Sequence, residues 1–347
     1  MGQAFELSKS SQAGAAKIQE LHDLWGRLYE RLALHPVSGQ EVLRVAATIK
    51  LGDEAGKPLP AETALEKFRS FCNKPDKTVT ISNWLYDVAD QLVKLQGNIY
   101  REPVTRILQA RVLAVALMLC ETLTKQERDK CLEQWERVTF RIYGLSGKDA
   151  RTKVGDYVRL AKNIINRAQG ASRYSEIMDS LRELGADHPV GQAVEMVRGA
   201  NCYDGFAEET RYVLWRYEEF LAREAGADIN KEARDQIWKE RSATDSIEHV
   251  FPQNPEPGGA WDGKLGKGKR LEDHVHRIGN LILLPQPLNE EAKRQGFAAK
   301  KNVYSKSEGL RSVREVMQKR DWGLRQIEER EANILRWAKN EWADLRD

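Results

Sequence analysis

Four polar residues in the last third of the chain have the types and spacing needed for phosphodiester hydrolysis. Glu248 and His249 are adjacent, and Asn280 and Asn289 follow them. The reaction needs a base for the attacking water, positive charge for the phosphoryl oxygens and stabilisation of the departing 3′ oxygen. A neutral imidazole beside a bound divalent cation supplies all three. These residues predict a metal-dependent phosphodiesterase site.

The segments that carry these residues predict two strands and a helix. Residues 246–251 form a short, apolar and partly β-branched run, which indicates a strand. Residues 277–284 indicate a second strand, which Pro285 ends. A helix is expected to begin near residues 288–289 and to run through the region of Lys300.

The expected elements give each polar residue a chemical role. Successive side chains point to opposite faces of a strand, so Glu248 can hold a metal while His249 faces the water, if the strand is twisted or bulged. Asn280 on the return strand can fix the backbone or orient the His249 ring. Asn289 can offer its amide oxygen to the cation. Oxygen ligands suit Mg²⁺ or Mn²⁺.

Further positions around the two strands complete a recognisable pattern. A His-x-x-Pro element joins His249 to Pro252, a Gly-Asn-Leu element follows at 279–281, and a second Asn lies downstream. These elements resemble the C-terminal HNH domain of the GmrSD family, which comprises bacterial modification-dependent (type IV) restriction endonucleases. Defence nucleases that act with phosphorothioate DNA modification share this domain. The matching strings are Ser246–Gln253, Arg277–Leu284, Leu288–Asn289, Phe297, Lys300 and Tyr304.

The resemblance covers about residues 241–306, and it implies a role for each matching position. His249 is the general base, Glu248 and Asn289 bind the metal, and Asn280 supports the loop. Lys300 matches a basic position that touches the scissile phosphate. The implied activity is an Mg²⁺- or Mn²⁺-dependent endonuclease that nicks or cleaves DNA within an anti-phage restriction system.

One part of the family pattern is absent from this sequence. Family members usually carry an N-terminal nucleotide-dependent sensor domain with an Asp-Gly-Gln-Gln-Arg motif, and no such motif occurs here. The chain therefore resembles the C-terminal half of such a protein or a separate nuclease subunit. Its expected partners are DNA and a nucleotide-dependent sensor domain or subunit.

Each residue also has a simpler structural interpretation. A lone histidine on a strand is more often a structural residue than a catalyst, and Glu248 fits a surface charge on an edge strand. Asn280 after a glycine is a common turn residue, and Asn289 is a good helix N-cap. Lys300 fits a solvated helix face. The combination of these residues, rather than any single one, favours the catalytic interpretation.

Two nearby histidines, His274 and His276, are left out of the core site. Either could be an additional ligand, but the sequence favours positions that are exposed or that lie near the phosphate. The alternative functions are a non-catalytic DNA-binding or docking module for a sensor partner, and an RNA nuclease. The catalytic chemistry does not separate DNA from RNA, and only the resemblance favours DNA.

A basic loop lies between the two expected strands. Residues 252–270 are rich in glycine and proline, and a loop of this length is usually functional or mobile. Its cations can grip DNA phosphates without reading sequence, and the alternative is a flexible, solvated loop. The cations are Lys264, Lys267, Lys269 and Arg270.

The remainder of the chain predicts helices. Its 347 residues, 41% hydrophobic and 31% charged with a net charge of +3, suit a globular protein of more than one domain. We expect a mainly α fold with a helical domain at 1–240, an HNH (ββα-metal) core at 241–306 and a helical cap at 307–347. The first helix is expected to carry one apolar stripe, made of Ile18, Leu21, Trp25, Leu28 and Leu32.

The cysteines and the lack of a targeting signal indicate a cytoplasmic protein. No two cysteines form a C-x-x-C pair, which excludes the zinc knuckle that some nucleases carry. Buried, reduced thiols are typical of cytosolic proteins. No secretory signal is visible, and the most apolar run, 112–120, is too short to span a bilayer. The cysteines are Cys72, Cys120, Cys131 and Cys202.

Overall fold

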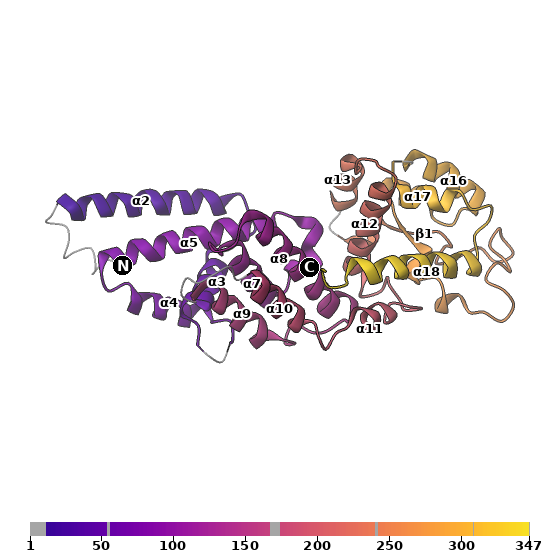
Figure 1. Ribbon diagram of the computed structural model, residues 1–347. Coiled ribbons are helices and arrows are strands. Elements are labelled where there is room, and N and C mark those ends of the chain that lie inside the picture. Colours follow the sequence, from indigo (N-terminus) through magenta and orange to yellow (C-terminus); the bar gives the residue numbers. More distant parts are fainter. Residues whose placement is uncertain (1–11, 54–55, 167–173, 240–241, 308, 347) are drawn as a thin grey trace. The chain divides into compact units, whose positions relative to one another are not determined.

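Helices dominate the computed structural model, which describes residues 12–53, 56–166, 174–239, 242–307 and 309–346 (Figure 1). The expected mainly α class is confirmed, and one two-stranded sheet occurs in these ranges. The chain divides into two compact units. One comprises Met1–Thr139, Lys148–Asp187 and Asp344–Asp347, and the other comprises Phe140–Gly147 and His188–Ala343.

The first unit is built from helices alone in its described residues. The first helix, α2, packs against α5 and buries Leu28 of the expected stripe. The other stripe residues are half-buried, and Leu24, which the stripe did not include, is buried as well. Helix α7 is apolar on most sides and almost wholly buried, as its composition predicts. The α-helices are α2 (Gln12–Ala33), α3 (Gly39–Leu51), α4 (Ala61–Phe71), α5 (Pro75–Gln96), α6 (Glu102–Thr105), α7 (Leu108–Met118), α8 (Lys125–Thr139), α9 (Val154–Asn166) and α10 (Tyr174–Leu184).

The second unit carries the sheet and the polar residues of interest. Helices α12 and α17 pack against β2, and α15 packs against β1. Its elements are a π-helical turn (Phe140–Leu145), α11 (Val190–Glu195), α12 (Ala207–Glu224), α13 (Lys231–Lys239), α14 (Ala243–Ser246), β1 (Ile247–His249), β2 (Leu281–Leu283), α15 (Gln286–Ala292), α16 (Phe297–Tyr304), α17 (Arg311–Met317) and α18 (Leu324–Glu341). Among the described helices of the whole chain, none is long and apolar enough to cross a membrane.

The two strands are antiparallel, and both are shorter than the sequence predicts. Glu248 pairs with Ile282 and His249 with Leu281. Residues Ile278–Asn280 form a 3₁₀ turn instead of the beginning of the strand, so Asn280 precedes β2. Gly279 lies in this turn and lets α18 approach it closely. A Cβ at this position would collide with a backbone carbonyl of that helix. The glycine of the Gly-Asn-Leu element is therefore required by packing.

The helix expected from residues 288–289 through Lys300 is two helices. Helix α15 begins earlier, at Gln286, with a proline in its first turn. It ends at Ala292, and Lys293 has a positive φ of 30° that breaks the helical path. A new helix, α16, then carries Lys300. Asn289 therefore lies inside α15, and the prediction that it opens the helix was wrong.

The compact units divide the chain differently from the expected boundaries at 240/241 and 306/307. The unit with the sheet contains Phe140–Gly147 and the continuous stretch His188–Ala343, so it includes α12 as well as the C-terminal helix α18. Helix α18 is tied to the sheet by the buried Arg330, whose Nη1 donates to the carbonyls of Gly279 (3.1 Å) and Leu281 (2.7 Å). The strands and the helices before and after them share one core.

The long segment 252–270 forms no α-helix or strand, as expected. It is nevertheless anchored at its centre by Trp261, which is 3% exposed. The indole Nε1 donates to the carbonyl of Gln295 at 3.0 Å, and the ring packs 4.8 Å from that of Phe251. The loop therefore has a fixed point at Trp261 next to the end of β1.

Candidate active site

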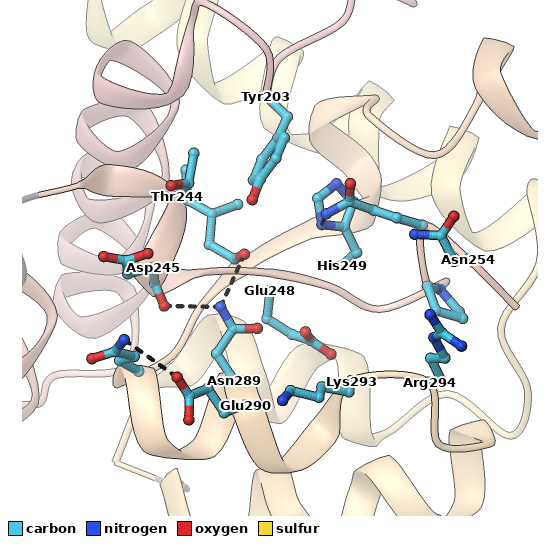
Figure 2. A pocket seen from close by; sticks show the side chains of 14 residues that line it. Tyr203, Thr244, Asp245, Glu248, His249, Asn254, Asn289, Glu290, Lys293 and Arg294 are labelled. Atoms are coloured by element: carbon cyan, nitrogen blue, oxygen red, sulfur yellow. Dashed lines mark hydrogen bonds between the residues drawn. The ribbon is translucent and has the colours of Figure 1, made fainter.

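Glu248, His249 and Asn289 line one polar pocket of about 320 Å³ (Figure 2). Strand β1 supplies the first two residues, and α15 supplies the third. On the side of α15, the exposed cations Lys293 and Arg294 complete the wall. The fold thus brings together three of the residues that the sequence selected.

Asn289 is held in a fixed orientation at this pocket. Its Nδ2 donates to the backbone carbonyls of Asp245 in α14 (2.9 Å) and of Ile247, the first residue of β1 (3.2 Å) (Figure 2). Both amide protons are therefore used on α14 and β1, and the amide oxygen is left on the opposite side. Asn289 both ties α15 to β1 and presents an oxygen acceptor to the pocket.

Glu248 forms a buried ion pair behind the pocket wall. Its Oε1 accepts from Lys300 Nζ at 2.6 Å and from the Tyr304 hydroxyl at 2.8 Å, and its side chain is 4% exposed. Burial raises the pKa of Glu248, against the lowering effect of Lys300 and Tyr304. Burial likewise lowers the pKa of Lys300, against the raising effect of Glu248. Each charge depends on its partner to remain ionised.

Lys300 is buried in the structure and does not have the position expected for a contact with a scissile phosphate. Lys300 is 0% exposed, and its Nζ is used by Glu248 and by the backbone carbonyl of His249 at 2.6 Å. An ammonium group without solvent access cannot reach a phosphate in this arrangement. Lys300 instead holds the two consecutive residues of β1 in place from α16.

His249 lies in an enclosed position between several polar and aromatic groups. Its Nδ1 is 3.1 Å from Gln253 Nε2, and its Nε2 is 3.0 Å from His276 Nδ1. The Tyr203 ring packs against the His249 ring in a T-shaped arrangement, with the ring centroids 4.5 Å apart. Burial lowers the pKa of His249 to about 3, with smaller contributions from His276 and Lys300. The ring is therefore neutral at pH 7, and one of its two nitrogens carries a lone pair.

Asn280 is a buried clamp for the backbone and does not touch the His249 ring. Its Oδ1 accepts from the Phe251 amide (2.8 Å) and from Trp322 Nε1 (3.0 Å). Its Nδ2 donates to the carbonyls of Phe251 (2.9 Å) and Val275 (2.8 Å). This arrangement agrees with the backbone-fixing role considered for Asn280, because it locks the chain where β1 leaves the sheet.

The four cations of the basic loop have different environments. Lys264 is paired with Asp321, and Arg270 donates to Asp273 at 2.8 Å. Internal pairing reduces the charge that these two residues offer to DNA. Lys267 and Lys269 are exposed at the surface of the loop. Any phosphate contact of the loop is therefore expected from Lys267 and Lys269 first.

The oxygen donors at the pocket fit a hard divalent cation. The Glu248 carboxylate and the Asn289 amide oxygen belong to the ligand class that Mg²⁺ and Mn²⁺ prefer. A carboxylate has about four lone-pair sites, so the two donors on Oε1 do not exhaust it. Within the described ranges, no three His, Cys, Asp or Glu side chains form a metal-binding group. Two protein ligands suit Mg²⁺, which usually keeps several waters.

Several pocket residues were not selected from the sequence. Tyr203 comes from the turn before α12, far from the motif, and nothing in the sequence connects it to His249. Gln253 belongs to the motif string itself, one residue after the expected Pro252, and its contact with His249 could have been suspected. Asp245 and Glu290 also line the pocket, and both directly adjoin residues of the motif.

Comparison with known proteins covers the same part of the chain. Residues 193–337 match the family model of the GmrSD restriction endonucleases, C-terminal domain. No curated protein matches the chain. The matched range contains every pocket residue described above and most of the stretch His188–Ala343 of the unit with the sheet. The resemblance expected from the motifs is confirmed: residues 193–337 are similar to the C-terminal domain of the GmrSD restriction endonucleases.

Proposed function

We propose that the chain is a metal-dependent endonuclease of the HNH (ββα-metal) type that nicks DNA in a restriction system. One observation carries the proposal: His249, Glu248 and Asn289 line a single pocket within the range matched by the restriction endonuclease family. Two antiparallel strands followed by α15 provide the ββα order of elements. A site of this kind cuts one strand at a time, so double-strand breaks require two chains or repeated events.

His249 acts as the general base in this proposal. The Nδ1 atom already has a hydrogen-bond donor, Gln253 Nε2, at 3.1 Å. An attacking water takes the place of that donor and gives its proton to Nδ1. Lys300 fixes the base from behind through the carbonyl of His249, and Asn280 fixes the backbone two residues further along.

Glu248 and Asn289 are the proposed ligands of Mg²⁺ or Mn²⁺. When bound, the cation offsets charge on the phosphoryl group and on the departing oxygen. Asn289 is oriented for this purpose by the two carbonyls that hold its Nδ2. Lys300 and Tyr304 favour the ionised form of Glu248 against the effect of burial. The hydrogen bonds behind the pocket thus orient the proposed ligands of the cation.

Removal of divalent metal is expected to abolish nicking. Supercoiled plasmid is incubated with the full chain in Mg²⁺, in Mn²⁺ or in EDTA, and the open-circular product is measured on a gel. Open circles should form with either metal and be absent in EDTA. Without the cation, Glu248 and Asn289 offer no positive charge to stabilise the leaving oxygen. Restoring excess Mg²⁺ to the EDTA sample should restore nicking.

Equal nicking in EDTA would exclude the proposed mechanism. A chain that does not cut supercoiled DNA in either metal, alone or with the proposed nucleotide-dependent sensor partner, would contradict the proposed function. Parallel incubation with a structured RNA distinguishes the two substrates. Cleavage of RNA in place of DNA would replace the proposed substrate while retaining the same chemistry.

Lys293 and Arg294 are the proposed contacts to the DNA backbone beside the scissile phosphate. Both are exposed, both line the pocket, and they lie on the connection between α15 and α16. The positive φ of Lys293 is a strained conformation for a residue with a side chain, and such strain concentrates at functional sites. Lys267 and Lys269 of the basic loop are proposed as a second, more distant contact.

Replacing both Lys293 and Arg294 with Ala should weaken DNA binding and leave the chemistry largely intact. The salt dependence of log K should become shallower by about 0.9 for each duplex phosphate that the protein no longer neutralises. Fluorescence anisotropy with a labelled duplex, titrated at several salt concentrations, measures this slope. The charge-preserving pair Lys293→Arg and Arg294→Lys is the matched control and should keep the slope of the unaltered protein. An unchanged slope in the double Ala variant would remove these residues from the interface.

One observation favours a second candidate, a non-catalytic docking module for a sensor partner. The Oε1 of Glu248 is used by Lys300 and Tyr304, which is also what a purely structural carboxylate would do. The two candidates differ in metal binding. A rise in melting temperature with Mn²⁺ that is lost in a Glu248→Gln and Asn289→Leu double variant supports the nuclease, and no effect of Mn²⁺ supports the docking module.

A further inference from the structure

We infer that His276 is a positioning residue that holds His249 in the tautomer whose free lone pair, on Nδ1, faces the pocket. The inference deepens the proposed function and rests on it for its catalytic meaning. It depends on a chain of polar contacts that ends at a carboxylate. The members are Gln253, His249, His276 and Asp204.

The carboxylate of Asp204, at one end of this chain of contacts, favours one direction of hydrogen bonding along it. Asp204 Oδ2 lies 3.7 Å from His276 Nε2, beyond a direct hydrogen bond but within ion-pair range. An ionised carboxylate attracts an N–H, so it favours the tautomer of neutral His276 that has its proton on Nε2. Its Nδ1 then carries a lone pair. That lone pair faces His249 Nε2 at 3.0 Å, which must supply the proton between them.

The near end of the chain agrees with this direction. A neutral imidazole with its proton on Nε2 has its lone pair on Nδ1. Gln253 Nε2, an amide donor, lies 3.1 Å from that atom of His249. Each hydrogen bond from Gln253 to His276 then has one donor and one acceptor. Reversing the tautomer of His249 would place two donors against each other at Gln253.

Three hydrogen bonds hold the segments of His276 and Asp204 together. The Cys202 amide donates to the His276 carbonyl at 2.9 Å, which fastens the turn before α12 to the segment before β2. In the same turn, Asn201 Nδ2 donates to Asp204 Oδ2 at 2.9 Å, and Asn201 Oδ1 accepts from the Asp204 amide at 3.0 Å.

An aromatic ring fixes the planes of both imidazoles. Tyr203 stacks on His276, with ring centroids 5.5 Å apart and an interplanar angle of 12°. Its ring also meets His249 at 4.5 Å and 70°. The His276 side chain is 16% exposed, so the contact with His249 is largely shielded from water. Neither ring can turn without losing this packing.

When His249 accepts the proton from water, its Nε2–H remains directed at the His276 lone pair. The hydrogen bond then has a charged donor and becomes stronger. For histidines that bind metals, replacing the hydrogen-bond partner of the ring typically costs about 10–100-fold in affinity or activity, and we expect a loss of that size here. His276 thus supports the base without touching the substrate, and Asp204 keeps His276 in the required tautomer.

The first test reads the tautomers directly and does not need activity. The full chain is labelled with ¹⁵N-histidine, and long-range ¹H–¹⁵N spectra are recorded near pH 7.5. His249→Gln and His276→Asn variants assign the two signals. Both histidines should be in the Nε2–H form, and His249 should become a mixture of tautomers in His276→Leu. An Nδ1–H form of His249 in the unaltered protein would overturn the inference.

The second test separates positioning from a purely structural role. His276→Asn keeps an acceptor near the place of Nδ1, whereas His276→Leu has a similar size and no acceptor. The Leu variant should lose about 10–100-fold in kcat with little change in KM, and the Asn variant should recover most of it. Equal losses in both variants at equal melting temperatures would overturn the inference. If the unaltered chain does not cut at all, the proposed function fails while the spectra still decide the tautomer.

Discussion

His249→Ala should lose nearly all DNA cleavage, by roughly 10²–10⁴-fold, the usual contribution of a general base. The replaced imidazole is neutral at pH 7, and its Nδ1 is the proposed acceptor of the proton from water. DNA binding should change little, because His249 is only 4% exposed and contributes almost nothing to the surface that DNA meets. Single-turnover cleavage of a labelled duplex, with affinity measured by anisotropy in Ca²⁺, separates the two effects.

A matched control is available on a neighbouring segment. His274 is another histidine of the segment before β2, and it does not line the pocket. His274→Ala should cut DNA at nearly the unaltered rate. Because His249 packs against Tyr203 and His276, the melting temperature of His249→Ala is measured first, and His249→Asn provides a second variant with less lost volume. Cleavage by both His249 variants at more than a tenth of the normal rate would reject His249 as the base.

The local order of elements could be predicted from the sequence because it depends on near neighbours. The β-branched run around Ile247 predicts β1, and the prolines at 285 and 287 mark the end of β2. The break at Lys293 could not be predicted, because it follows from an unusual backbone angle in a polar run with good helix formers. The position of Asn289 inside α15 follows from the same prolines, which begin the helix rather than only ending the strand.

The site itself was partly visible in the sequence. Residue types and spacing select Glu248, His249 and Asn289, because the chemistry requires a base and oxygen ligands. Here the elements that carry them, β1 and α15, are close in the sequence. The burial of Lys300 was not visible, since a lysine on a helix is normally solvated. Its position follows from long-range packing of α16 against β1, which places Nζ beside a carboxylate and a carbonyl.

Tyr203 and His276 illustrate the same limit for the base. Their contact with His249 depends on the hydrogen bond between the Cys202 amide and the His276 carbonyl. The turn before α12 and the segment before β2 are far apart in the sequence, and neither has a pattern that refers to the other. A single sequence gives residue types within an element reliably, whereas contacts between remote turns require the folded structure.

Lys300→Met should destabilise the unit that carries the sheet by about 3–5 kcal/mol, the usual cost of removing one partner of a buried ion pair. Methionine has a similar length and is apolar, so the loss reports the missing charge rather than a cavity. Glu248 would remain buried with only the Tyr304 hydroxyl on Oε1, and the His249 carbonyl would lose its donor. Urea unfolding followed by tryptophan fluorescence measures the change in free energy.

The neighbouring residue on the same helix is the matched control. Lys301 is partly exposed, and its Nζ donates to the backbone carbonyl of Lys319. Lys301→Met removes the same charge without leaving a buried carboxylate, so it should cost no more than about 1 kcal/mol, the range of a surface interaction. Similar losses for the two variants would mean that net charge, rather than the pair with Glu248, determines the stability.

A double variant separates the structural role of the pair from its proposed catalytic role. Combining Lys300→Met with Glu248→Gln removes both charges, and the amide oxygen of Gln can still accept from Tyr304. The double variant should therefore be more stable than Lys300→Met alone, because no unpaired charge is left in the core. It should still be inactive, since the proposed ligand of the cation has lost its charge. A stable double variant that cuts DNA at the normal rate would show that Glu248 serves the fold alone, and the cation would then need other ligands at the pocket.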